Sequence, residues 1–173
     1  ADLWLPVTAA AAARAIYEAA TGLLTKSDMS RIADRRARLE ERKREMIAAE
    51  EERAQEAGRR RLLHPRWVAY QLAKVLEPDA ILLDDSLSNS PHVRAYHGLD
   101  KPGTYFKSGG SSGGWGSGAA FGAKLAKPDS DVVLATGDGF FIYGTPLAAL
   151  WSAAHYKAPF LTVVFVNRSY VTG

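Results

Sequence analysis

The chain has no cysteine among its 173 residues, and this absence excludes disulfides, thiolate metal sites and cysteine nucleophiles. It also has no apolar run of the length that a membrane-spanning helix needs, so we expect no membrane partner. The apolar residues 3–7 have Asp2 in front and Arg14 behind, whereas a secretory signal begins with positive charge. We therefore expect a cytoplasmic protein.

A strong excess of one charge is lacking as well. The net charge is +3, and residues 28–61 hold eleven Lys and Arg against nine Asp and Glu. Mixed signs within one segment are typical of a solvated helix rather than of a phosphate-binding face. We therefore expect no nucleic-acid partner.

An initiating Met is missing, and the chain stops just after a strand-like segment, so we expect a piece of a larger protein. Residues 1–27 predict one helix, at about 9–24. Residues 28–61 predict a long charged helix, capped by Ser27 or Asp28, with acid-first pairs such as Glu40 and Arg44. A connecting helix packed along one edge is favoured over a coiled coil or an RNA-binding arm.

From residue 62 onward, short apolar runs alternate with helical patterns, which predicts an α/β domain. The runs at 80–83, 132–136 and 161–166 predict buried strands. Thr145 is expected to cap a helix that begins at Pro146. One core-facing stripe is predicted on that helix, formed by Leu147, Leu150, Trp151 and Ala154.

Polar residues directly follow two of the predicted strands. Gly137-Asp138-Gly139 follows the run 132–136, and Asn167 ends the run 161–166, with a helical segment between them. Right-handed crossovers make such strands parallel, so their carboxyl ends meet at the edge where open α/β sheets bind ligands. A carboxylate and an amide oxygen suit Mg²⁺, which is usually shared with a phosphate group. The pattern predicts a metal-diphosphate site.

Two further segments allow more than one interpretation. The residues 84–90, which include Ser86, Ser88 and Asn89, form either a loop that caps the next helix or a phosphate cradle. The glycine-rich residues 109–118 form either a flexible linker or a close backbone approach to a ligand, and the helix and strand that follow favour the ligand.

Taken in order, these segments resemble the thiamin diphosphate-dependent enzymes of the acetolactate synthase and benzoylformate decarboxylase superfamily, which act on 2-oxoacids. The resemblance implies a doubly wound, mostly parallel α/β sheet with helices on both faces, preceded by the long charged helix. Residues 62–173 would be the diphosphate-binding domain, incomplete at its C-terminus. Residues 28–61 would be a linker, and residues 1–27 the tail of a middle domain.

The resemblance also implies roles for individual residues. Mg²⁺ would be held by the side chains of Asp138 and Asn167 and by the carbonyl of Ser169. The Ser111 carbonyl would accept a hydrogen bond from the aminopyrimidine ring of the cofactor. The remaining residues expected to contact the cofactor are Ser86, Ser88, Asn89, Gly113, Gly137, Gly139 and Phe140.

Three departures from the family pattern stand out. The spacing from Asp138 to Asn167 is about two residues longer than usual, with the excess near residues 141–145. Phe140 stands where a serine is common. Gly113 falls where the family has a bulky aliphatic side chain beneath the folded cofactor, and Trp115 is a candidate to replace it.

The implied activity is decarboxylation of a 2-oxoacid or carboligation, with thiamin diphosphate and Mg²⁺ as cofactors. The resemblance leaves FAD open and places the activating Glu outside this chain, so a homodimer or homotetramer is expected to complete the site. One alternative is a nicotinamide-binding Rossmann domain, because Gly116-Ser117-Gly118 precedes a helix and Asp138 follows about 20 residues later. Another is a non-catalytic scaffold member of the same family.

Overall fold

The computed structural model describes residue 4 and residues 6–97, 100–110 and 113–169. The chain divides into two compact units, Ala1–Ala49 and Glu50–Gly173. This division lies inside one long helix, and the domain borders expected near residues 28 and 62 stay predictions. Among the described residues, no helix combines the length and the apolar character needed to cross a membrane.

The first unit holds helix α1 (Ala9–Leu23) and the first part of helix α2 (Lys26–Gly58). The expectation that Ser27 or Asp28 caps α2 was wrong, because Thr25 takes this position. The Asp28 carboxylate accepts hydrogen bonds from the Thr25 N–H at 2.9 Å and its hydroxyl at 2.6 Å, while the Thr25 hydroxyl accepts from the Asp28 N–H at 3.2 Å. This reciprocal pairing is a capping box with an aspartate in the third helical position.

Ion pairs along α2 also differ from those expected. Glu40 pairs with Arg36 at 3.4 Å instead of Arg44, which pairs with Glu41. Neighbours three residues apart are as close on a helix as neighbours four apart, so the mixed charges allow several pairings. These side chains are exposed, and each pair contributes only a few tenths of a kcal/mol.

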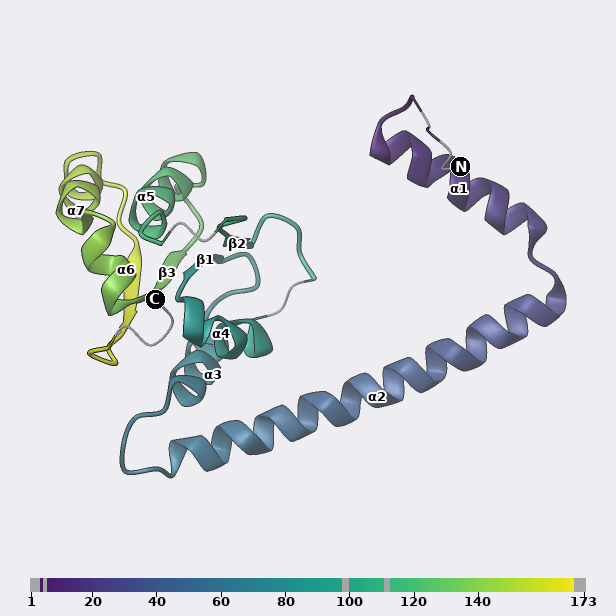
Figure 1. Ribbon diagram of the computed structural model, residues 1–173, viewed down its shortest axis with the longest axis horizontal. Helices are drawn as coiled ribbons and strands as arrows, with labels where there is room; N and C mark the ends of the chain where they lie inside the picture. The colour runs from purple at the N-terminus through teal and green to yellow at the C-terminus, as the bar shows by residue number, and fades with distance from the viewer. Residues whose placement is uncertain (1–3, 5, 98–99, 111–112, 170–173) are drawn as a thin grey trace. The chain divides into compact units, whose positions relative to one another are not determined.

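The second unit is built on a parallel sheet with the strand order β2-β1-β3-β4. The strands are β1 (Ile81–Asp85), β2 (Tyr105–Lys107), β3 (Val132–Gly137) and β4 (Leu161–Phe165). Helices α3 (Pro65–Val75) and α4 (Ser90–Tyr96) lie on one side of the sheet, and α5 (Gly116–Ala126) and α7 (Pro146–His155) lie on the other (Figure 1). The predicted doubly wound α/β fold is therefore confirmed.

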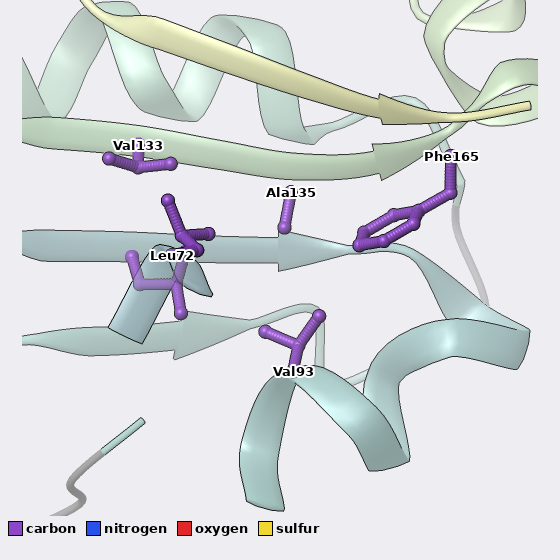
Figure 2. Close-up of a cluster of buried hydrophobic side chains, with 6 residues drawn as sticks. Leu72, Val93, Val133, Ala135 and Phe165 are labelled. Atoms are coloured by element: carbon purple, nitrogen blue, oxygen red, sulfur yellow. The ribbon is translucent and has the colours of Figure 1, made fainter. Parts of the chain in front are cut away.

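Each face of the sheet has its own hydrophobic cluster, because successive strand side chains point to opposite faces. On the first face, Leu72 of α3 and Val93 of α4 lie against strand side chains (Figure 2). The buried members of this cluster are Leu72, Leu82, Val93, Val133, Ala135 and Phe165. On the second face, Ala120 of α5 packs on Ile81, Leu83, Val132 and Leu134. Both faces are covered, as a parallel sheet requires.

Strand β1 runs further than predicted. It extends through Asp84 and Asp85, which pair with Ala135 and Thr136 of β3, so both acids belong to the buried sheet. The sequence pattern ends this strand at Leu83 and predicts a loop from Asp84 onward, since carboxylates are rare in buried strands. Strand β2 was not predicted, since it is only three residues long and only partly buried.

The helix α7 faces differently from the prediction. Its large apolar side chains are exposed, with 81% of Leu147 and 65% of Trp151 accessible, and its buried residue is Ala153. The predicted core-facing stripe was therefore wrong, because the buried residue of this helix, which contacts α5, is the small Ala153. Thr145 does precede Pro146, but its side chain makes no capping hydrogen bond, and its backbone is left-handed at φ 49°.

Candidate functional site

The site lies where the strand order reverses direction. From β1 the chain moves outward to β2, and from β3 it moves the opposite way to β4, so the two connections diverge at the carboxyl ends of β1 and β3. Open α/β sheets bind ligands in the crevice at such a switch point. The fold thus predicts a ligand site between the segments that follow these two strands.

A cleft occupies this switch point, and it is lined from β1, β3 and β4. Nine of the eleven residues predicted to contact the cofactor line it: Ser86, Ser88, Asn89, Gly137, Asp138, Gly139, Phe140, Asn167 and Ser169. Leu87 and Phe165 complete the lining, and the cavity measures about 50 Å³. This space suffices for an ion with a few water molecules or for a phosphate group.

Asp138 links the turns after β3 and β4. It is the first residue of helix α6 (Asp138–Tyr143), and its Oδ1 accepts the Gly139 N–H at 3.1 Å. Its Oδ2 accepts the N–H of Arg168 at 3.0 Å, and the Asn167 Oδ1 accepts the Ser169 N–H at 2.9 Å. The structure therefore brings Asp138 and Asn167 to one place, as their positions after parallel strands predict.

The segment after β1 forms the opposite wall of the cleft. It contains the 3₁₀ turn η1 (Leu87–Asn89), which leaves Ser88 exposed and Asn89 partly buried. Ser86 is buried, and both its N–H and its hydroxyl donate to Asp84 Oδ1, at 3.1 and 2.6 Å. A hydroxyl has one proton to donate, so Ser86 can offer the cleft only an acceptor.

Asp84 holds this wall in place through a buried hydrogen-bond network. Its Oδ2 accepts hydrogen bonds from the hydroxyls of Ser90 and Tyr105, and Lys107 Nζ donates to the Ser90 hydroxyl at 2.7 Å. Burial raises the pKa of Tyr105, and the hydrogen bond to the Asp84 carboxylate raises it further. Asp84 is thus fully partnered, and it positions η1 rather than facing a ligand.

Asp85 acts on the other face of the sheet. Its Oδ2 accepts the N–H groups of Gly114 at 3.0 Å and Gly116 at 3.2 Å, which pins the glycine-rich segment to β1 at the start of α5. Burial raises the pKa of Asp85, while the two hydrogen bonds oppose the shift. Sequence reasoning missed the roles of Asp84 and Asp85, and the available signal was a pair of adjacent acids at the end of a buried strand.

Gly113 lies next to the cleft and against Phe140. A Cβ atom on Gly113 would lie 2.2 Å from Cδ1 of the Phe140 ring, so this ring already fills the space of a side chain at position 113. Trp115, the candidate to replace that side chain, packs against the hydrophobic cluster under α5. The remaining predicted contact, Ser111, lies outside the described residues.

Comparisons with known proteins agree with this geometry. Residues 88–172 match the family described as thiamine pyrophosphate enzyme, C-terminal TPP binding domain. This part of the chain is therefore similar to the TPP-binding domain of thiamin diphosphate-dependent enzymes. The relatives found include acetolactate synthases and benzoylformate decarboxylases.

Three relatives illustrate this similarity. Benzoylformate decarboxylase of Pseudomonas aeruginosa is 34% identical over 108 residues, which cover 62% of this chain and 20% of that protein. The probable acetolactate synthase large subunit of Methanococcus aeolicus is 31% identical over 113 residues, covering 62% and 18%. The solved structure of a thiamine diphosphate-dependent 4-hydroxybenzoylformate decarboxylase from Rhodococcus jostii RHA1 superposes with a TM-score of 0.58 at 35% identity, covering 62% and 20%. The chain thus spans about a fifth of the length of these relatives.

Proposed function

We propose that this cleft anchors the diphosphate of thiamin diphosphate through Mg²⁺, in an enzyme that decarboxylates a 2-oxoacid or joins it to a second carbonyl compound. The observation that carries the proposal is the convergence at the switch point. Asp138 bridges the turns after β3 and β4, and Ser88 and Asn89 line the same cleft from β1.

The donor set fits Mg²⁺ shared with a phosphate. Each Asp138 oxygen accepts one backbone N–H, and so does Asn167 Oδ1, which leaves lone pairs on all three oxygens. In the described part of the chain, no three His, Asp or Glu side chains gather into a metal site. A metal held here would therefore need phosphate or water oxygens, as Mg²⁺ sites commonly do. The Ser169 carbonyl is proposed as a further ligand.

The residues of this chain would bind and orient rather than transfer protons. Gly137, Gly139 and Phe140 would contact the diphosphate through their backbone, opposite Ser88 and Asn89. Ser86 would support this wall through Asp84, to which its hydroxyl donates. When bound, the cofactor supplies the carbon nucleophile that adds to the 2-oxoacid carbonyl and allows CO₂ to leave. The activating Glu is expected outside this chain.

Calorimetric titration with thiamin diphosphate, with and without Mg²⁺, tests the proposal on the complete protein. Saturable binding that needs Mg²⁺ is expected, and Asp138→Ala should weaken it by about 100-fold or more, because a metal ligand is lost. The matched control is Asp129→Ala. Asp129 is an exposed acid in the turn before the amino end of β3, whereas the cleft lies at the carboxyl end. Normal Mg²⁺-dependent binding by Asp138→Ala would refute the anchor.

Two alternatives are less well supported. A dinucleotide fingerprint requires its glycines directly after a strand, whereas eight residues separate β2 from α5. A non-catalytic scaffold member would show no Mg²⁺-dependent binding in the titration above. Completion of the site in a homodimer or homotetramer and a cytoplasmic location stay predictions, and the question of FAD stays open.

A further inference from the structure

Two of the departures from the family pattern meet in space. The Phe140 ring lies where a side chain at position 113 would be, since a Cβ on Gly113 would approach its Cδ1, Cε1 and Cγ atoms to 2.2, 2.3 and 2.5 Å. Cβ atoms essentially never come this close to other atoms, so a side chain at position 113 would force the Phe140 ring to shift. Phe140 also lines the cleft with Asp138, two residues before it.

The third departure, the longer segment after Phe140, lies against the same glycine-rich segment. A Cβ on Gly144 would lie 2.3 Å from the carbonyl oxygen of Gly114, and one on Gly114 would lie 2.7 Å from Cα of Gly144. Gly114 has φ 92°, and Thr145 has φ 49°, which is rare for a β-branched residue. The two backbones therefore meet in a conformation that both glycines permit.

Both sides of this contact are fixed. Asp85 holds Gly114 and Gly116 from β1, and the Gly144 N–H donates to the Phe140 carbonyl at 2.9 Å, which closes α6. The Phe140 ring thus packs against a glycine-rich segment that Asp85 holds, and its own helical turn ends in the hydrogen bond from Gly144. Its position relative to Asp138 is set by rigid neighbours rather than by a free loop.

We infer that Phe140 is a positioning residue, whose ring replaces the side chain absent at Gly113 and supports the ring end of the bound cofactor. This inference rests on the proposed function. Thiamin diphosphate joins its diphosphate to two flat rings through a short linker, so a diphosphate held at Asp138 leaves the rings close by. Phe140 offers these rings an apolar surface, and aromatic faces favour such stacking.

The test compares Phe140→Ser, Gly113→Leu and the double variant with the wild type, all in the complete protein. Two properties are measured: Mg²⁺-dependent affinity for thiamin diphosphate by calorimetry, and exchange of the thiazolium C2 proton of the bound cofactor by NMR. The exchange rate reports how the two rings are held, and it requires no turnover of substrate.

Phe140→Ser should weaken the cofactor affinity by about two- to tenfold, because an aromatic contact is lost while the diphosphate anchor stays. It should also slow the C2 exchange on the order of tenfold or more, because small misplacements of reacting groups are costly. Gly113→Leu should clash with the ring and weaken binding. The double variant should exchange within about threefold of wild type, because the leucine takes the space that the ring leaves.

The outcomes separate the two proposals. A wild-type protein without Mg²⁺-dependent binding refutes the proposed function itself. Normal binding together with a wild-type exchange rate in Phe140→Ser refutes the role of Phe140 alone, and so does a double variant that exchanges no faster than Phe140→Ser. If Phe140→Ser fails to fold, Phe140→Val takes its place, with slower exchange expected and a wild-type rate refuting the role.

Discussion

Replacing Asp85 tests how the glycine-rich segment is held. One oxygen of this buried carboxylate accepts both the Gly114 and Gly116 N–H groups. Asp85→Ala leaves two backbone donors without their partner, at about 1–3 kcal/mol each, and removes a negative charge from the start of α5. We expect a loss of about 3 kcal/mol in the free energy of unfolding.

Asp85→Asn separates the hydrogen bonds from the charge. An amide oxygen can take the place of Oδ2 and accept both N–H groups, so the expected loss at neutral pH is below about 1 kcal/mol. Burial raises the pKa of Asp85 above the unfolded value of 3.8, so the folded protein binds this proton more tightly than the unfolded chain does. The contribution of Asp85 to the free energy of unfolding is therefore greatest below pH 3.8, and it is lost as the pH rises through the pKa of Asp85 in the folded protein. Asparagine has no such loss, and the gap between variant and wild type should narrow with rising pH.

Urea unfolding at several pH values measures these free energies, and hydrogen exchange of the Gly114 and Gly116 amides reports the clamp directly. The control is Asp79→Ala, in the exposed turn before the amino end of β1, with an expected change within about 0.5 kcal/mol. An Asp85→Ala variant with wild-type stability and unchanged protection of both amides would refute the reasoning. A gap between Asp85→Asn and wild type that widens with rising pH would refute the charge argument.

Two further predictions concern other parts of the second unit. Burial raises the pKa of Glu50, but the hydrogen bond from Arg53 and the charge of Arg66 lower it below its usual value of 4.5. The stabilising contribution of Glu50 is therefore present above pH 4.5 and is lost on acidification. Glu50→Gln should therefore flatten the acid side of the profile of melting temperature against pH, and an unchanged profile would contradict this. Gly114→Ala should cost about 2 kcal/mol or more because of its positive φ and tight backbone contact, whereas Gly118→Ala, with open space inside α5, should stabilise by about 0.5–1 kcal/mol. Thermal unfolding compares the two, and equal effects would contradict the strain argument.

The strands that carry the site were predictable because their pattern is local. The mostly apolar runs 132–136 and 161–166 form β3 and β4, and Gly137 and Asn167 follow these runs directly. Parallel pairing then brings Asp138 and Asn167 together without any knowledge of the side chains around them. The sequence pattern and the right-handed crossover rule together therefore predict which residues meet at the site.

Other features could not be predicted, because they depend on partners far away in the sequence. Asp84 and Asp85 are tolerated in the buried strand because Ser90 and Gly116 supply donors, and a sequence does not show such partners. The exposed face of α7 was missed for a similar reason. The period of its apolar residues reveals a stripe, but not whether small or large side chains face α5.

The adjacent acids of β1 explain how one strand can shape a site between two loops. Side chains alternate along a strand, so Asp84 reaches the η1 turn on one face and Asp85 reaches the glycine-rich segment on the other. The first contact sets the wall that holds Ser88 and Asn89. The second holds the segment against which Phe140 packs, and Phe140 follows Asp138 in the same helix. Both walls of the cleft are thus held by hydrogen bonds to β1. Replacing one of the two acids should therefore displace the wall that it holds and leave the opposite wall in place.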